Sequence, residues 1–171
     1  MNTIIVTGGN INDNFLKEYL LKNKFDIIIA ADRGLDLLSK INVLPNYIIG
    51  DFDSVNKKIL SEYERKKISI TYLKPEKDYT DTHMALKQAI SIGSNKITII
   101  GATGTRIDHT LANINILKEA LGSNIEAKII DENNEILLIE KNKILKKNDR
   151  FKYVSILPFT SKLLRSNLRR F

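Results

Sequence analysis

The chain has 171 residues, of which 43% are hydrophobic, with no cysteine, no tryptophan and a formal net charge of +7. This length suits one domain, or one domain and part of another, and the apolar content excludes a chain that is disordered throughout. The lack of cysteine excludes disulfide bonds, thiolate metal sites and cysteine nucleophiles, and it agrees with a location in the cytoplasm. The first residues contain no basic n-region, so we expect no signal peptide, and no apolar stretch approaches the roughly 20 residues of a membrane span, so we expect no membrane partner.

The positive charge is concentrated at the C-terminal end of the chain. Of the 27 basic and 20 acidic residues, ten basic residues and one acidic residue follow Glu140, so the first 140 residues carry a net charge of −2. A nucleic-acid-binding surface would need clustered basic residues with aromatic side chains between them, or a known motif. The sequence therefore argues against a nucleic-acid partner and leaves only the basic C-terminal segment as a candidate for binding RNA or DNA.

Short β-branched runs alternate with helical patterns along the first 130 residues. We expect strands at residues 3–7, 26–30, 47–49, 69–73, 96–100 and 125–130, because these runs are apolar almost throughout, as strands covered on both faces are. Apolar residues at helical spacing predict helices around residues 15–20, 84–89 and 111–117. The alternation predicts an α/β fold, an open and mostly parallel sheet with helices on both faces.

The pattern changes after Asp131. Residues 135–140, 143–146 and 151–157 are apolar or alternating runs separated by polar turns, which favours antiparallel strands. We therefore expect an α/β domain over residues 1–131 and the start of an all-β unit over residues 132–171. Within that unit, residues 161–171 form a basic tail of unusual sequence.

Acidic residues follow several of the predicted strands. The carboxyl ends of parallel strands meet at one edge of the sheet, where open α/β proteins bind their ligands. Carboxylates gathered there repel one another, and Mg²⁺ is the cation that suits a site of carboxylates in a chain with two histidines and no cysteine. The aspartates in these loops are Asp32, Asp51, Asp53, Asp78, Asp81 and Asp108.

Basic residues and glycines lie in the same loops. Lys77 and Arg106 are suited to neutralising the charge of a phosphoryl group in transfer. Gly101 and Gly104 would let backbone N–H groups approach a phosphate at the start of a helix. Together with the aspartates, these residues predict a Mg²⁺–polyphosphate site and phosphoryl or nucleotidyl transfer.

Each of these signals also has a purely structural interpretation. An Asp-x-Asp sequence after a strand is typical of a turn, and Thr80 and Asp108 are typical N-caps of helices. The functional interpretation is favoured by the number of acids at one edge, since independent caps have no reason to gather there. Other positions for which a structural role is expected are the turn at Gly8 and Gly9, the turn at Gly101 and Gly104, the lone His83 and His109, and Asp36 as a surface charge on a helix.

The four loops resemble the motifs of the thiamine pyrophosphokinase family. The second and third motifs are the most specific, and the resemblance runs from about residue 3 to residue 160. A further segment at residues 153–160 resembles the entry to the second domain of the family. The matching segments are Ala31-Asp32-Arg33-Gly34, Ile49-Gly50-Asp51-Phe52-Asp53-Ser54, Lys77-Asp78-Tyr79-Thr80-Asp81 and Gly101-Ala102-Thr103-Gly104-Thr105-Arg106-Ile107-Asp108-His109.

The resemblance implies transfer of a diphosphate group from ATP to the hydroxyl of thiamine, giving thiamine diphosphate and AMP, with Mg²⁺ as cofactor and a homodimer as the assembly. It implies that Asp51, Asp53 and Asp81 hold Mg²⁺ and that Asp78 joins them around the triphosphate. It also assigns Arg106 and Lys77 to the phosphates. The residues left to orient or contact the nucleotide are Asp32, Arg33, Thr80, Gly101, Thr103, Gly104, Asp108 and His109.

The C-terminal end departs from the family. Family members continue past the Pro-Phe-Thr segment into a full antiparallel β-sandwich, which helps to form the dimer and completes the thiamine pocket. Residues 161–171 match no family segment, so we expect only the start of this sandwich, as in a shortened or frame-shifted chain. Two alternatives to transfer onto thiamine stay open: a Mg²⁺-dependent phospho- or nucleotidyl-transferase with another acceptor, and an inactive nucleotide-binding remnant.

Overall fold

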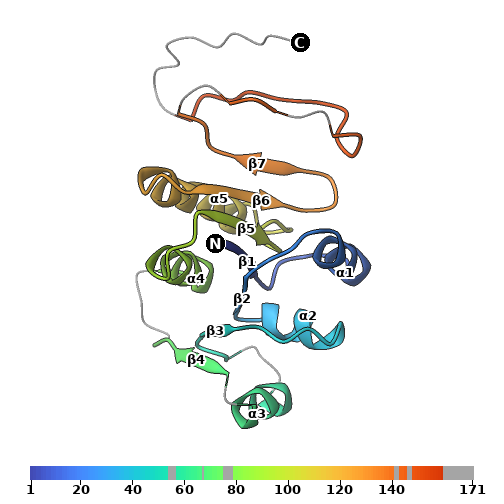
Figure 1. Cartoon of the computed structure of the whole chain (residues 1–171), viewed down its shortest axis with the longest axis vertical. Coiled ribbons are helices and arrows are strands. Elements are labelled where there is room, and N and C mark those ends of the chain that lie inside the picture. Colours follow the sequence, from blue (N-terminus) through green and yellow to red (C-terminus); the bar gives the residue numbers. More distant parts are fainter. Residues whose placement is uncertain (54–56, 67, 75–78, 141–142, 146–147, 160–171) are drawn as a thin grey trace.

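A seven-stranded sheet forms the centre of the molecule. The structure is a computed structural model that describes residues 1–53, 57–66, 68–74, 79–140, 143–145 and 148–159. The strand order is β4-β3-β2-β1-β5-β6-β7. Neighbouring strands are parallel except β6 and β7, which are antiparallel (Figure 1). The open, mostly parallel α/β fold expected from the sequence is confirmed.

The first six strands begin and end within one residue of the expected segments. In the inner strands β-branched side chains explain this agreement, because Ile and Val fit a pleated surface that is covered on both faces, whereas the edge strand β4 is largely exposed. In β1, for example, Ile4 and Ile5 are both wholly buried although they point to opposite faces. The strands are β1 (Asn2–Val6), β2 (Ile27–Ala31), β3 (Tyr47–Gly50), β4 (Ser69–Tyr72), β5 (Lys96–Ile100), β6 (Glu126–Ile130) and β7 (Glu135–Leu137).

Helices cover both faces of the sheet, as expected. Ile5 of β1 belongs to the core shared with α4 and α5, whereas Ile4 belongs to the core shared with α1, α2 and α3. Figure 1 shows α1 and α2 on one side of the sheet and α4 on the other. The helices are α1 (Asp13–Lys22), α2 (Gly34–Lys40), α3 (Lys57–Arg65), α4 (Asp81–Ser91) and α5 (Ile107–Gly122).

Three details differ from the expectations. The helix α3 was not expected, and Asp36 on α2 is half-buried rather than a surface charge. Residues 143–145 and 151–157 contain no strand, and position 146 lies outside the described residues. A strand forms only where a neighbouring strand can hydrogen-bond to its backbone N–H and C=O groups, and an alternating apolar pattern does not by itself provide such a neighbour. Of the run expected at residues 135–140, only Glu135–Leu137 forms a strand, the antiparallel β7, which joins the edge of the main sheet beside β6.

Among the described residues, no helix is both long and apolar enough to cross a membrane.

Candidate active site

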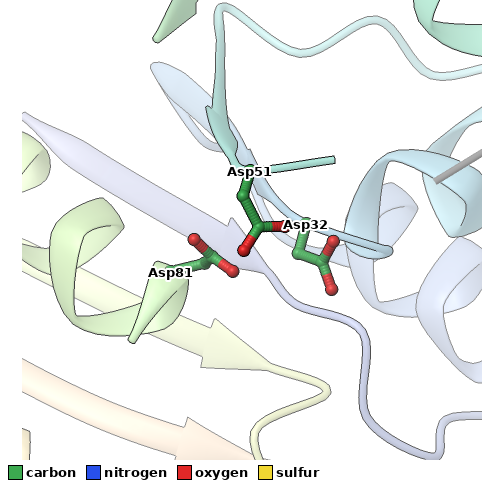
Figure 2. A group of neighbouring side chains, drawn as sticks. All are labelled: Asp32, Asp51 and Asp81. Carbon is green, nitrogen blue, oxygen red and sulfur yellow. The ribbon is translucent and has the colours of Figure 1, made fainter. Parts of the chain in front are cut away.

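Three carboxylates converge at the carboxyl ends of β2 and β3. Asp32 follows β2, Asp51 follows β3, and Asp81 is the first residue of α4. Each offers one carboxylate oxygen, and these oxygens lie within 4.8 Å of one another. All three residues are half-buried, and Figure 2 shows their side chains next to one another on three separate segments. Carboxylates at this spacing repel unless a cation lies among them, so the group is suited to a divalent ion.

The turns that carry Asp32 and Asp51 have unusual backbone conformations. Asp32 has a φ of +48° and Phe52, directly after Asp51, has a φ of +59°. The left-handed region is unfavourable for a residue with a Cβ atom, most of all for a bulky one, and such strain is concentrated at functional sites. Packing compensates at Phe52, whose buried ring meets Tyr72 edge-on with the centroids 5.3 Å apart. The N–H of Asp32 donates to the carbonyl of Ile49 at 2.9 Å, which ties the two turns together.

The first turn of α4 positions the third carboxylate. Thr80 is the N-cap, and its Oγ1 accepts a hydrogen bond from His83 N at 3.2 Å, so the expected cap is confirmed. Asp81 then occupies the first helical position, where the helix dipole favours a negative charge. The ring of His83 has the structural contact expected of a lone histidine, because its Nε2 lies 2.6 Å from Glu119 Oε2 on α5.

Asp53 lies outside the group of three. Its N–H donates to Asp51 Oδ1 at 3.2 Å, and its side chain is exposed. The group instead contains Asp32, which the sequence assigned to orientation. The assignment of Asp53 to Mg²⁺ stays a prediction, and Lys77 and Asp78 lie outside the described residues.

Arg106 and Asp108 form an exposed ion pair on the loop after β5. The guanidinium reaches both carboxylate oxygens, with Nη2–Oδ2 at 2.5 Å and Nε–Oδ1 at 3.2 Å. This hydrogen bonding is the main reason why the pKa of Asp108 is lowered and that of Arg106 is raised. The helix α5 begins at Ile107 with Arg106 as N-cap, so the alternative that Asp108 is the cap is wrong. His109 Nε2 lies 4.0 Å from Asp108 Oδ2.

The loop after β5 is held by two neighbouring segments. Gly101 has a φ of +78°, and its carbonyl accepts a hydrogen bond from Gly9 N at 2.8 Å. Thr103 Oγ1 donates to Asp131 Oδ2 at 2.8 Å, so the hydroxyl proton of Thr103 is already used within the protein. Burial raises the pKa of the Asp131 carboxyl, but hydrogen bonds from the following turn and from Thr103 outweigh it and leave this pKa lowered. Gly104 beside them is exposed.

Sequence reasoning missed three residues that support these loops. Thr7 and Thr82, the residue after Asp81, form a buried hydroxyl pair, and Asp131 accepts a hydrogen bond from Thr103. Only their positions in the sequence could have indicated them, because each of the three residues adjoins the end of a strand or the start of a helix at the ligand-binding edge of the sheet. Nothing in their local sequence says which partner each one meets.

Comparisons with known proteins agree with one another. A family model described as "Thiamin pyrophosphokinase, catalytic domain" matches residues 19–129. The thiamine pyrophosphokinase of Bacillus subtilis (strain 168) is 31% identical over 161 residues, covering 94% of this chain and 75% of the relative. Thiamin pyrophosphokinase 1 of Caenorhabditis elegans is 28% identical over 128 residues, covering 70% and 51%.

The fold is also similar to solved structures. The crystal structure of thiamine pyrophosphokinase from Bacillus subtilis has a TM-score of 0.69 at 32% identity, covering 80% of this chain and 63% of that one. This chain therefore spans less than two thirds of that structure. The family match covers well over half of this chain and includes Asp32, Asp51 and Asp81. The chain belongs to the thiamine pyrophosphokinase family.

Proposed function

We propose that this chain transfers the diphosphate group of ATP to the hydroxyl of thiamine, giving thiamine diphosphate and AMP. The observation that carries the proposal is the convergence of Asp32, Asp51 and Asp81 in a member of this family. The relatives named above are thiamine pyrophosphokinases, which supports thiamine as the acceptor. Transfer to another acceptor and an inactive remnant are not favoured.

The donor chemistry of the carboxylate group fits Mg²⁺. This ion prefers hard oxygen ligands, and it usually takes one or two carboxylates together with waters and substrate phosphates. Three carboxylate oxygens within 4.8 Å of one another offer such ligands from Asp32, Asp51 and Asp81, and Asp53 is proposed as a further ligand. When bound, Mg²⁺ supplies positive charge that neutralises the transferring phosphates.

The other assignments complete the proposed nucleotide site. Arg106 is proposed to contact the phosphates, because a guanidinium binds phosphate oxygens in pairs and its exposed ion pair with Asp108 is readily exchanged. The loop at residues 101–104 is proposed to offer backbone N–H groups to the nucleotide. Lys77 and Asp78 keep their proposed roles at the phosphates. The remaining residues proposed to contact the nucleotide are Arg33, Thr80, Thr103 and His109.

The organisation of the chain is also proposed. We propose a catalytic α/β domain at residues 1–131, whose sheet is extended at its edge by β7, and the start of a β-sandwich in the rest of residues 132–171. The family resemblance favours a homodimer if the β domain assembles, and the sequence favours a location in the cytoplasm without nucleic-acid or membrane partners. The net charge of −2 over the first 140 residues supports the absence of nucleic acid.

The experiment incubates the chain with ATP, Mg²⁺ and thiamine and separates the products by chromatography. We expect AMP and thiamine diphosphate in equal amounts. Replacing a carboxylate that stabilises the transferring charge should lower the rate about 100-fold, so Asp51→Asn and Asp81→Asn should each lose almost all activity.

Asp13→Asn is the matched control, because Asp13 is also the first residue of a helix but lies on α1 with a side chain exposed by 45%. Its activity should equal that of the unchanged chain. ADP as the sole nucleotide product would exclude diphosphate transfer, and unchanged activity of Asp81→Asn would exclude the proposed metal site.

A further inference from the structure

A pair of buried hydroxyl groups includes the neighbour of Asp81 on α4. Thr7 Oγ1 and Thr82 Oγ1 are 2.9 Å apart and share a hydrogen bond. Thr7 immediately follows β1 and is 7% exposed, whereas Thr82 lies in the first turn of α4, next to Asp81, and is 6% exposed. The pair therefore joins the central strand of the sheet to the helical turn that carries one of the three carboxylates.

The backbone at Thr7 is fixed by close packing from two sides. Thr7 N donates to the carbonyl of Ile100 at 2.9 Å. A Cβ atom on Gly101 would lie 2.2 Å from the carbonyl oxygen of Thr7, and one on Gly34 would lie 3.0 Å from Thr7 N. Gly34 begins α2, two residues after Asp32. Thr7 is thus a fixed point that the Asp32 turn and the loop after β5 both touch.

The three carboxylates differ in how they are held. Asp32 and Asp51 follow neighbouring strands, and a backbone hydrogen bond from Asp32 N to the strand of Asp51 links their turns. Asp81 comes from a helix that is attached to the sheet by side chains. Its cap, Thr80, bonds within α4, and His83 bonds sideways to α5, whereas Thr82 bonds to the strand side at Thr7.

We propose that Thr82 is a positioning residue which, through Thr7, sets the distance between Asp81 and the other two carboxylates. The inference rests on the proposed function, because it assigns Thr82 to the metal-binding geometry of that site. Without its hydroxyl partner, the first turn of α4 would move relative to β1, and Asp81 would no longer meet Asp32 and Asp51 at the same spacing.

The opposite end of β1 provides a matched control. There Thr3 Oγ1 and Ser94 Oγ are 2.7 Å apart, with both residues as deeply buried as the first pair. This second pair joins the same strand to the segment after α4, at the edge of the sheet away from the carboxylates. A role in stability alone would make Thr3→Val and Thr82→Val equivalent.

The test measures the dissociation constant of Mn²⁺ by calorimetry in the absence of ATP and thiamine, so that no turnover is needed and chelation of Mn²⁺ by ATP does not contribute. We expect Thr82→Val to raise this constant about tenfold, the lower end of what loss of a supporting contact costs a metal site. Thr3→Val should leave the constant unchanged, although both variants unfold at lower temperatures. Thr82→Ser, which keeps the hydroxyl, should bind Mn²⁺ like the unchanged chain.

An unchanged Mn²⁺ constant in Thr82→Val, or an equal rise in Thr3→Val, would overturn the inference. If Thr82→Val does not fold, Thr7→Val removes the same hydrogen bond from the strand side and should show the same loss. A chain that binds no Mn²⁺ before any substitution would overturn the proposed function itself, which is a different result.

Discussion

Gly9 stands where the segment after β1 meets the loop after β5, and no larger residue fits there. A Cβ atom would lie 2.0 Å from the carbonyl oxygen of Gly101 and 2.6 Å from that of Thr103. Both obstacles are backbone atoms, which cannot turn away as a flexible side chain would. The turn expected at Gly8 and Gly9 is therefore also a close approach of two loops at the proposed nucleotide site.

We expect Gly9→Ala to lower the free energy of unfolding by about 2 kcal/mol, because the added methyl group must push the two loops apart. The measurement is urea-induced unfolding. Gly122→Ala is the matched control, since a Cβ at this helical position has no atom within 4 Å. Alanine is the better helix former, so the control should be neutral or more stable. Equal losses in the two variants would show that Gly9 is not confined as described.

The aspartates also show what sequence can predict about a site. That Asp51 and Asp81 belong together followed from their places at the ends of elements. That Asp32 joins them while Asp53 remains exposed depends on two left-handed turns, at Asp32 and Phe52. A pattern of residue types does not reveal these φ values.

At the scale of elements, strands were predicted well and polar elements poorly. The central strands β1, β2 and β5 are largely apolar runs, and such a run has few alternatives in a sheet covered on both faces. The helix α3 was missed because Ile59, Leu60 and Tyr63 are its only apolar residues. The prediction of a strand at residues 151–157 was wrong although this segment is rich in apolar residues. It has no partner strand in the described part of the chain.

Arg150 attaches the turn at residues 148–150 to α1 and β6. Its guanidinium carbon lies 4.3 Å from the ring centroid of Phe15 and 5.1 Å from that of Phe151, and its Nη2 donates to the carbonyl of Asp131. A planar guanidinium stacks between rings in a way that an ammonium group cannot. Arg150 therefore adds side-chain contacts that connect the turn to the rest of the fold.

Arg150→Lys should lower the free energy of unfolding by about 1 kcal/mol, because it keeps the charge but loses the stacked geometry. Urea-induced unfolding measures this loss. Arg65→Lys, at an exposed position on α3, is the control and should have no measurable effect. If the two lysine variants were equally stable, the contact between Arg150 and Phe15 would contribute nothing to folding.

Over the whole molecule, paired carboxylates connect folding to pH. Hydrogen bonds lower the pKa of Glu119 through His83 and that of Glu126 through Lys143. The pKa of Asp131 is lowered as well, despite its burial. A carboxyl group whose pKa is lower in the folded state binds fewer protons there than in the unfolded chain. Its contribution to stability is present above its unfolded pKa, about 4, and is lost as pH falls through the folded pKa.

We expect the free energy of unfolding to fall steeply as pH drops below about 4, and Asp131 to account for a measurable share of the slope. At pH 7, Asp131→Asn should be less stable by about 2 kcal/mol, because charged acceptors form the stronger hydrogen bonds. This difference should shrink as pH falls, since protonation removes the same charge from the unchanged chain. Glu62→Gln is the control, because Glu62 is an exposed carboxylate on α3, so it should follow the unchanged chain at every pH. A constant difference between Asp131→Asn and the unchanged chain from pH 7 to pH 3 would mean that the Asp131 carboxylate has no lowered pKa, and that Thr103 is held by shape rather than by charge.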